Sequence, residues 1–244
     1  MIRMQWFREN YFKDIEKGNT ITVLDVGSRI VPRQVETYKI FFNEKPFKYI
    51  GLDMVEGNNV DIVLKKPYQW EEISDSFCDV LICGQVFEHI EFPWITISEI
   101  ARVVKPGGLI CIIAPSMSRL HRHPVNCQNY FSDGMIALAK YAGLDVIHVS
   151  TNLAPINAPI AWYGSAEDTM LVARKLGGGG AGVDLCNYRC EPADLKKMAT
   201  GFIPLKEQPY FYIYNRKMNI KRRLKIIFWP IFGLRSVIRK MLKL

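Results

Sequence analysis

The chain has 244 residues, of which 49% are hydrophobic and 23% are charged, and its formal net charge at pH 7 is +8. This length suffices for one well-buried domain with an appendage. No apolar run approaches the roughly 18 residues of a membrane-spanning helix, and the N-terminus lacks the apolar core of a signal peptide. We therefore expect neither a membrane span nor secretion, and we predict a cytoplasmic protein.

The first predicted element is a strand over residues 21–26, an apolar run that only Asp25 interrupts. A carboxylate within a buried strand is costly unless it has a partner or a function. Gly27 and Ser28 follow at the carboxyl end of the strand, where a glycine lets a ligand approach the backbone closely. Asp25, Gly27 and Ser28 are therefore candidate ligand-binding residues.

A second strand is predicted over residues 47–52, directly before Asp53, and a third over residues 60–64. In nucleotide-binding sheets, a carboxylate at the tip of the second strand accepts hydrogen bonds from both ribose hydroxyls. We expect this role for Asp53, with the adjacent Met54 also at the cofactor. The glycine pattern GxGxxG is absent, which disfavours an NAD-linked enzyme.

Residues 79–115 are the most informative segment, because they read as strand, polar loop, helix, glycine turn and strand. The apolar runs at 79–83 and 109–114 are too short for core helices and suit buried parallel strands. Pro93 can begin the helix between them, whose apolar residues recur with helical spacing. We expect the Pro-Gly-Gly sequence at 106–108 to end it.

Three polar residues, Gln85, Glu88 and His89, follow the strand at 79–83. Open α/β sheets bind ligands at this position, beyond the carboxyl ends of their strands. His89 is a candidate base, because an imidazole titrates near neutral pH and can take a proton from a hydroxyl. Glu88 is a candidate for cofactor binding, and it is equally well explained as an acid in the first turn of the following helix.

A polar and aromatic loop covers residues 116–133 and could bind a hydroxylated or anionic acceptor. His121 is the second candidate base. His121 and His123 are not predicted to bind a metal, because no acidic partner at ligand spacing accompanies them. The sequence therefore predicts no metal site.

The last elements of the domain are a helix over residues 134–142 and two strands at 144–150 and 169–173. Ser132 or Asp133 would cap the start of the helix.

Four motifs identify a family: VLDVGS at 23–28, YIGLD at 49–53, FCDVLICGQVFEHI at 77–90 and ISEIARVVKPGG at 97–108. They resemble class I S-adenosylmethionine-dependent methyltransferases. Together with residues 121–147, they look like a bacterial subgroup often encoded with glycan-assembly enzymes. The resemblance implies a Rossmann-like, doubly wound α/β fold. Its mostly parallel seven-stranded sheet would have helices on both faces and an antiparallel pair of strands at one edge.

The resemblance also implies S-adenosylmethionine as the cofactor, with Asp25 and Gly27 near its methionine part and Asp53 on its ribose. Gln85 to His89 would lie where the cofactor meets the acceptor. We expect methyl transfer to an oxygen of a sugar or glycan intermediate at the cytoplasmic membrane face, with His89 or His121 taking the proton.

Two alternatives remain open. Asp25 and Asp53 also have structural interpretations, as a helix cap and a turn acid.

The family's first loop usually carries further glycines, whereas residues 28–32 of this chain are bulky. A non-catalytic cofactor-binding or scaffolding subunit of a membrane-associated glycan assembly complex is therefore the alternative function.

The sequence divides into a methyltransferase domain at residues 1–176, a linker or small extension at 177–215 and a basic tail at 216–244. From Arg216 to Leu244 there are ten Lys or Arg and no acids, so the rest of the chain carries a net charge of −2. Because apolar residues separate these basic ones, the tail is typical of an amphipathic segment on anionic lipid. The apolar run at 226–234 makes nucleic acid an unlikely partner, and a helix docked on its own domain is the remaining alternative.

Overall fold

A computed structural model describes the fold of residues 1–12, 19–31, 34, 36–118, 120–122, 124–151 and 167–177. The expectations for residues 178–215 and for the basic tail lie outside the described residues.

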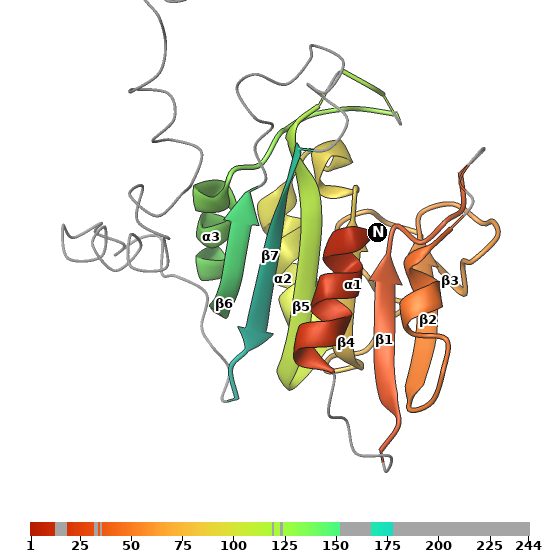
Figure 1. The fold of residues 1–244 in the computed structure, drawn as a ribbon. Coiled ribbons are helices and arrows are strands. Elements are labelled where there is room, and N and C mark those ends of the chain that lie inside the picture. Colours follow the sequence, from red (N-terminus) through yellow and green to blue (C-terminus); the bar gives the residue numbers. More distant parts are fainter. Residues whose placement is uncertain are drawn as a thin grey trace, which may run out of the picture. The chain divides into compact units, whose positions relative to one another are not determined.

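The described residues form one seven-stranded sheet in the order β3-β2-β1-β4-β5-β7-β6 (Figure 1). The strands are β1 Ile21–Val26, β2 Phe47–Asp53, β3 Ile62–Val63, β4 Cys78–Gly84, β5 Val104–Met117, β6 Leu144–Thr151 and β7 Glu167–Lys175. Strand β7 runs antiparallel to β5 and β6, and the other pairs are parallel. The sequence predicted this doubly wound, mostly parallel sheet, and the prediction is confirmed.

The strand order reverses between the neighbouring strands β1 and β4, which lie side by side although β2 and β3 separate them in the chain. Open α/β sheets bind ligands at such a reversal, beyond the carboxyl ends of the strands. Gly27 directly follows β1, and Gly84 is the last residue of β4 and is followed by Gln85. We therefore expect a ligand-binding site at the carboxyl ends of β1 and β4.

Helices cover both faces of the sheet (Figure 1). On one face α2 (Pro93–Val103) and α3 (Ser132–Tyr141) pack on alternate strand residues such as Leu24 and Leu81. On the other face α1 (Ile2–Tyr11) buries Met4 and Phe7 against the intervening residues, such as Val23. Because successive side chains of a strand point to opposite faces of the sheet, each strand contributes alternate residues to two separate hydrophobic cores.

Helix α1 was not predicted from the sequence. Only Met4 and Phe7 of its ten residues are buried, so its apolar pattern is too sparse to indicate a helix. Arg3 fixes this helix to the sheet, because its guanidinium forms an ion pair with Asp168 of β7 and donates to the Ser150 hydroxyl at 3.0 Å.

Some predicted boundaries are wrong. Helix α2 ends at Val103, and β5 begins at the next residue rather than at Leu109. The Pro-Gly-Gly sequence at 106–108 lies in an irregular stretch of β5, where the pairing with β4 shifts register and Gly107 has a φ of +81°. The additional residues of β5 between Val104 and Leu109 form a bulge, which is possible because Gly107 adopts a left-handed conformation.

The predicted cap of α3 is also wrong. The helix begins at Ser132 and has no side-chain cap, and the Ser132 hydroxyl lies 2.8 Å from the Thr151 hydroxyl. Thr151 belongs to β6, so the start of the helix is held by the sheet instead. Within the described part of the chain, no helix is both long and apolar enough to cross a bilayer.

Candidate active site

The turn after β1 brings two loops of the strand-end edge into contact. Gly27 has a φ of +78°, and a Cβ atom on it would lie 2.2 Å from Cγ2 of Val86, in the loop after β4. Its backbone N–H donates to the carbonyl of Leu52 at 2.8 Å. Only glycine fits this position, and the turn is exposed. The close approach of a ligand to this backbone stays a prediction.

Asp25 lies buried beneath this turn and accepts a hydrogen bond from the Tyr49 hydroxyl at 2.5 Å. Asn59 donates to the same hydroxyl at 2.9 Å and to the Ser28 carbonyl at 2.9 Å. In return, the Ser28 hydroxyl donates to the Asn59 carbonyl at 2.8 Å. Asp25 and Ser28 thus support the turn through Tyr49 and Asn59, and their direct contact with a cofactor stays a prediction.

Burial raises the pKa of Asp25 to about 7, although the Tyr49 hydrogen bond favours the ionised form. The nearby charge of Asp53 raises this pKa further. The buried carboxyl therefore titrates near neutral pH.

Asp53 ends β2 at the same edge, as predicted. One oxygen accepts from the Arg29 N–H at 3.2 Å and the other from the Val55 N–H at 3.0 Å. A carboxylate has about four acceptor positions, so both oxygens can accept further hydrogen bonds. Met54 follows with 43% of its surface exposed. Both residues are accessible to a cofactor, and their role stays a prediction.

Gln85 directs the loop after β4. It is exposed and has a φ of +60°, which is uncommon for a residue with a side chain. Its N–H donates to the Ile113 carbonyl of β5 at 2.8 Å, which holds this conformation. The chain then enters the short helix η2 (Phe87–His89), which carries Glu88 and His89.

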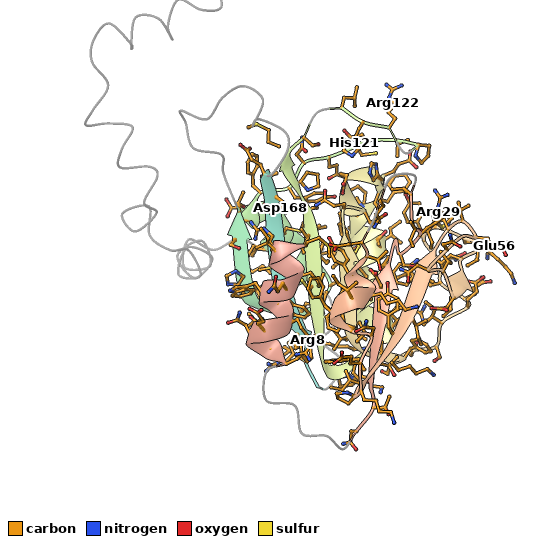
Figure 2. The ribbon with its side chains drawn as sticks, turned by 45° about the vertical axis from the view of Figure 1, so that its right-hand side comes forward. Arg8, Arg29, Glu56, His121, Arg122 and Asp168 are labelled. Atoms are coloured by element: carbon orange, nitrogen blue, oxygen red, sulfur yellow. The ribbon has the colours of Figure 1, made fainter. Side chains whose placement is uncertain are left out.

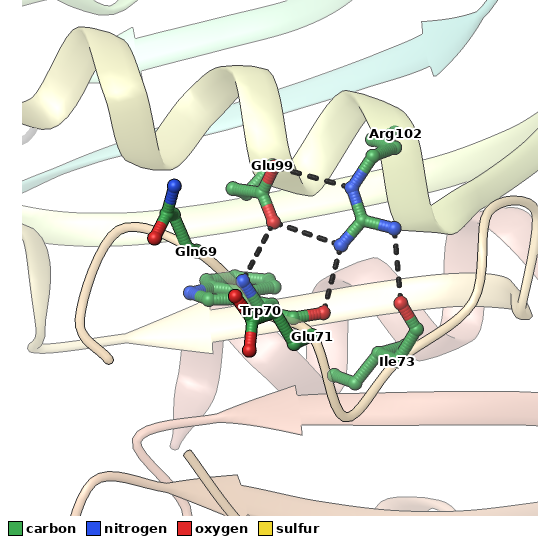
Figure 3. Close-up of a pocket in the computed structure, with 6 residues that line it drawn as sticks. All are labelled: Gln69, Trp70, Glu71, Ile73, Glu99 and Arg102. Carbon is green, nitrogen blue, oxygen red and sulfur yellow. Dashed lines mark hydrogen bonds and ion pairs between the residues drawn. The ribbon is translucent and has the colours of Figure 1, made fainter. Parts of the chain in front are cut away.

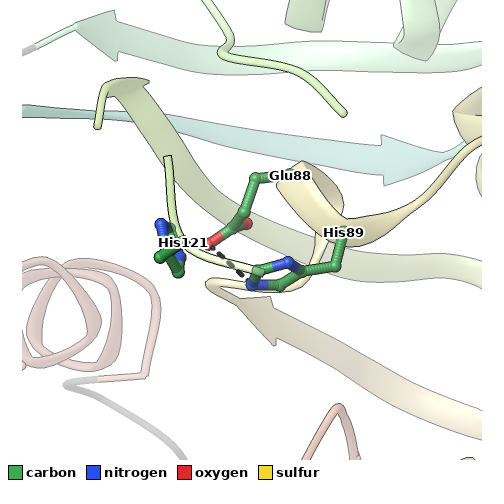
Figure 4. A group of neighbouring side chains, drawn as sticks. All are labelled: Glu88, His89 and His121. Atoms are coloured by element: carbon green, nitrogen blue, oxygen red, sulfur yellow. Dashed lines mark ion pairs between the residues drawn. The ribbon is translucent and has the colours of Figure 1, made fainter. Parts of the chain in front are cut away.

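Glu88, His89 and His121 form one group at this edge (Figure 4). Nδ1 of His89 lies 2.6 Å from the Val125 carbonyl oxygen, and Nε2 lies 3.7 Å from a Glu88 carboxylate oxygen. The His121 ring stands edge-on to that of His89, with 5.1 Å between centroids. His121 and the adjacent Arg122 lie at the top of Figure 2, above the strand ends. The structure thus brings both predicted bases together.

Glu88 is fully buried, and neither carboxylate oxygen has a hydrogen-bond partner among the described residues. Burial raises the pKa of Glu88 to about 7. Glu88 lies in the first turn of η2 rather than in that of α2, which begins at Pro93 and contains no acid. Its predicted cofactor contact is untested, and the structure places it against the two imidazoles.

Sequence reasoning missed this grouping because it compared His121 only with His123, which lies outside the described residues. The signal was the pair of predicted strands at 79–83 and 109–114, which lie side by side as β4 and β5. Parallel neighbours end at the same edge, so the loops that follow them meet.

Tyr38 also lies at this edge, and the sequence analysis did not single it out. A Cβ atom on Gly84 would lie 2.3 Å from the Tyr38 hydroxyl, so the phenol lies directly against the end of β4. Burial raises the pKa of Tyr38, and the charge of Asp25 raises it further. No local pattern marks this residue, because it lies in the connection between β1 and β2.

A groove of about 340 Å³ lies elsewhere, between α2 and the segment before β4 (Figure 3). Arg102 donates there to Glu99 at 2.8 Å and to the carbonyls of Trp70 and Ile73 at 2.9 Å each. The Ser76 N–H donates to the Arg102 carbonyl, so the groove lies at the amino end of β4. Its polar groups hold α2 to that segment, and it is not part of the strand-end site.

The comparisons with known proteins concern the domain that bears this site. Residues 24–112 match the family model described as a methyltransferase domain. No curated protein matches the chain.

Several solved structures share the fold. A protein from Bacillus halodurans C-125 described as a methyltransferase has a TM-score of 0.52 at 14% identity, and the match covers 72% of this chain and 98% of the other. A protein from Galdieria sulphuraria described as a sarcosine dimethylglycine methyltransferase has a TM-score of 0.52 at 13% identity, covering 72% and 86%. The cyclase SpnF has a TM-score of 0.51 at 15% identity, covering 72% and 82%. At these identities, the likeness establishes the fold.

Proposed function

We propose that the chain is a class I S-adenosylmethionine-dependent methyltransferase and that it methylates a hydroxyl oxygen of a sugar or glycan intermediate. The match of residues 24–112 to a methyltransferase domain supports the proposal. The site residues fit this cofactor. Gly27 is exposed and adds no side chain of its own beside Val86, and Asp53 has acceptor positions for ribose hydroxyls.

The observation that carries the proposal is the group of Glu88, His89 and His121 beside the Gly27 turn. It brings groups that can take a proton to the edge where the cofactor is expected, because Val86 of the same loop contacts Gly27. A hydroxyl acceptor needs such a group, since its proton must leave as the new bond to oxygen forms.

S-adenosylmethionine supplies a methyl group on a sulfonium sulfur. The neutral thioether S-adenosylhomocysteine is a good leaving group, so the donor needs little activation. The protein therefore mainly aligns the acceptor and excludes water. A carbonyl oxygen only accepts, so Nδ1 of His89 carries the hydrogen toward Val125. In the neutral ring, the lone pair is then on Nε2, which faces Glu88. In its simplest form, the mechanism has this Nε2 take the proton of the acceptor hydroxyl.

The choice of a sugar or glycan rests on the resemblance of the sequence to proteins encoded with glycan-assembly enzymes. The basic tail supports a location at the cytoplasmic membrane face, because it combines ten Lys or Arg with many apolar residues and contains no acid. Nucleotide sugars and lipid-linked sugars are the acceptor classes that this location favours.

Calorimetry with S-adenosylmethionine and S-adenosylhomocysteine tests the cofactor part of the proposal. A transferase binds both compounds, because it must hold substrate and product in one pocket. Binding of neither compound would support the non-catalytic scaffold that the bulky first loop suggests.

Methyl transfer from labelled S-adenosylmethionine to nucleotide sugars, lipid-linked sugars, protein and RNA tests the acceptor class. Labelling of only protein or RNA would contradict the proposal.

With an acceptor in hand, His89→Ala should lower kcat by roughly 10²- to 10⁴-fold, the usual contribution of general acid–base catalysis. Cofactor affinity should change little, because His89 acts on the acceptor. An equal loss of cofactor affinity in a folded variant would place His89 on the cofactor side instead.

A further inference from the structure

The group of Glu88, His89 and His121 has the geometry of a metal site. Each residue offers one ligand atom, and these atoms all lie within 4.8 Å of one another. Ligands about 2.0–2.2 Å from a zinc-like cation are roughly 3–4 Å apart. The 3.7 Å between Glu88 and Nε2 of His89 already meets this condition. The exposed His121 is the side chain that would move inward.

His89 is oriented as metal-binding histidines usually are. Its Nδ1–H donates to the Val125 carbonyl at 2.6 Å. Such a bond to a backbone carbonyl sets the tautomer and directs the other ring nitrogen, with its lone pair, toward the metal. Here, that nitrogen is directed toward Glu88.

Glu88 provides the independent observation. Its side chain is 1% exposed, and neither carboxylate oxygen has a hydrogen-bond partner in the described part of the chain. A buried carboxylate in this state is costly, because the lost hydration outweighs the interactions that remain around it. A cation held between Glu88 and the imidazoles would replace the lost hydration.

The donor set indicates the class of cation. Two imidazoles and one carboxylate bind catalytic zinc and non-haem iron, and in both cases other coordination positions stay open. We propose that Glu88, His89 and His121 bind a divalent transition-metal cation, which coordinates the acceptor hydroxyl through an open position.

The role of the cation at the hydroxyl rests on the proposed function, whereas its binding does not. A coordinated hydroxyl loses its proton more easily, because the cation stabilises the resulting oxyanion. His89 then acts as a ligand rather than as the base, and the proton passes to solvent. The cation also fixes the position of the acceptor oxygen beside the Gly27 turn.

Calorimetry on the full chain, freed of metal by a chelator and carrying no polyhistidine tag, tests the binding of ZnCl2 and MnCl2. One equivalent of at least one cation should bind. His121→Asn and Glu88→Gln should each weaken binding roughly tenfold or more, since even second-sphere changes cost 10- to 100-fold. His148→Asn is the matched control, because His148 lies outside the group with its ring 3.0 Å from the Ser150 hydroxyl, and it should bind like the wild type.

His121 is exposed, so its replacement leaves the core intact even where Glu88→Gln prevents folding. Absence of metal binding by the wild type, or equal binding by His121→Asn, would overturn the inference. Parallel titration with S-adenosylmethionine separates the two proposals. Cofactor binding without metal binding contradicts the metal site alone, and metal binding without cofactor binding contradicts the proposed function alone.

Discussion

At the scale of residues, two buried carboxyls at the strand-end edge differ in what surrounds them. Asp25 accepts a hydrogen bond from Tyr49, whereas the oxygens of Glu88 have no hydrogen-bond partner among the described residues. Burial raises the pKa of each to about 7. Asp25 thus has a structural partner beneath the Gly27 turn, whereas Glu88 is the carboxyl for which we propose a bound cation.

Replacing Asp53 should weaken the binding of S-adenosylmethionine. If its carboxylate accepts from the ribose hydroxyls, Asp53→Ala should cost about 1.5–3 kcal/mol, the range for hydrogen bonds to charged groups. Calorimetry measures the change, and a thermal melt checks that the variant folds. Glu56→Ala is the control, since Glu56 is an exposed acid a few residues further along the same loop. Unchanged affinity in folded Asp53→Ala would remove Asp53 from the site.

Stability should depend on pH through Asp25. Its pKa is raised from 3.8 to about 7 in the folded protein, so the folded state binds more protons than the unfolded state between these values. Stability therefore falls as the pH rises from about 4 to 7, and for this residue alone the loss between pH 5 and 7 is about 2 kcal/mol.

Asp25→Asn removes this titration while keeping an oxygen that can accept from Tyr49. Urea unfolding at pH 5, 6 and 7 should show a smaller loss of stability in the variant than in the wild type. Parallel curves for the two proteins would show that Asp25 is ionised throughout this range.

At the scale of elements, Arg3 links α1 to the sheet strands β6 and β7 through polar contacts. Arg3 donates to the Ser150 hydroxyl and to the Asp168 carbonyl, at 3.0 and 2.8 Å. Its ion pair with Asp168 is largely sheltered, with the Arg3 side chain 11% exposed. The ion pair between Lys66 and Glu71 is instead open to solvent, with side chains 52% and 64% exposed.

The two ion pairs should therefore differ in energy. Arg3→Ala should lower the free energy of unfolding by about 1–3 kcal/mol, because Asp168 and Ser150 lose their partner where water reaches them poorly. Lys66→Ala should cost less than about 1 kcal/mol, as is usual for exposed pairs. Urea denaturation measures both. A smaller effect for Arg3→Ala than for Lys66→Ala would mean that the other contacts of α1, such as the burial of Met4 and Phe7, hold the helix without Arg3.

At the scale of the whole molecule, charge is distributed unevenly along the chain. The segment from Arg216 to Leu244 holds ten basic residues, and the remainder carries a net charge of −2. Without this segment, the protein has no evident attraction to an anionic surface.

Deleting residues 216–244 should abolish sedimentation with anionic vesicles and leave S-adenosylmethionine binding intact, because all predicted cofactor residues precede the tail. Added salt should weaken the association of the full chain with these vesicles, since it screens the basic residues. Neutral vesicles serve as the control. Aggregation or a much lower melting temperature of the truncated protein would instead support a tail that covers its own domain.

The sequence by itself determined the strands and the residues at their ends. Apolar runs such as residues 21–26 and 79–83 are local, and so are the polar residues that follow them, so Asp53 and Gln85 could be placed at one edge without a structure. Helix α1 and the irregular start of β5 were not predicted from the sequence, because a sparse apolar face and a glycine-rich bulge give little local signal.

Only the tertiary structure decided which of these residues act together. Tyr49 reaches Asp25 because β1 and β2 pair in parallel, and the pairing places Tyr49 beside Val23, near Asp25. Glu88 and His121 meet because β4 and β5 are neighbours and their loops leave at the same edge. Such contacts depend on strand order and register, which join residues far apart in the chain, and so no local pattern of residues could specify them.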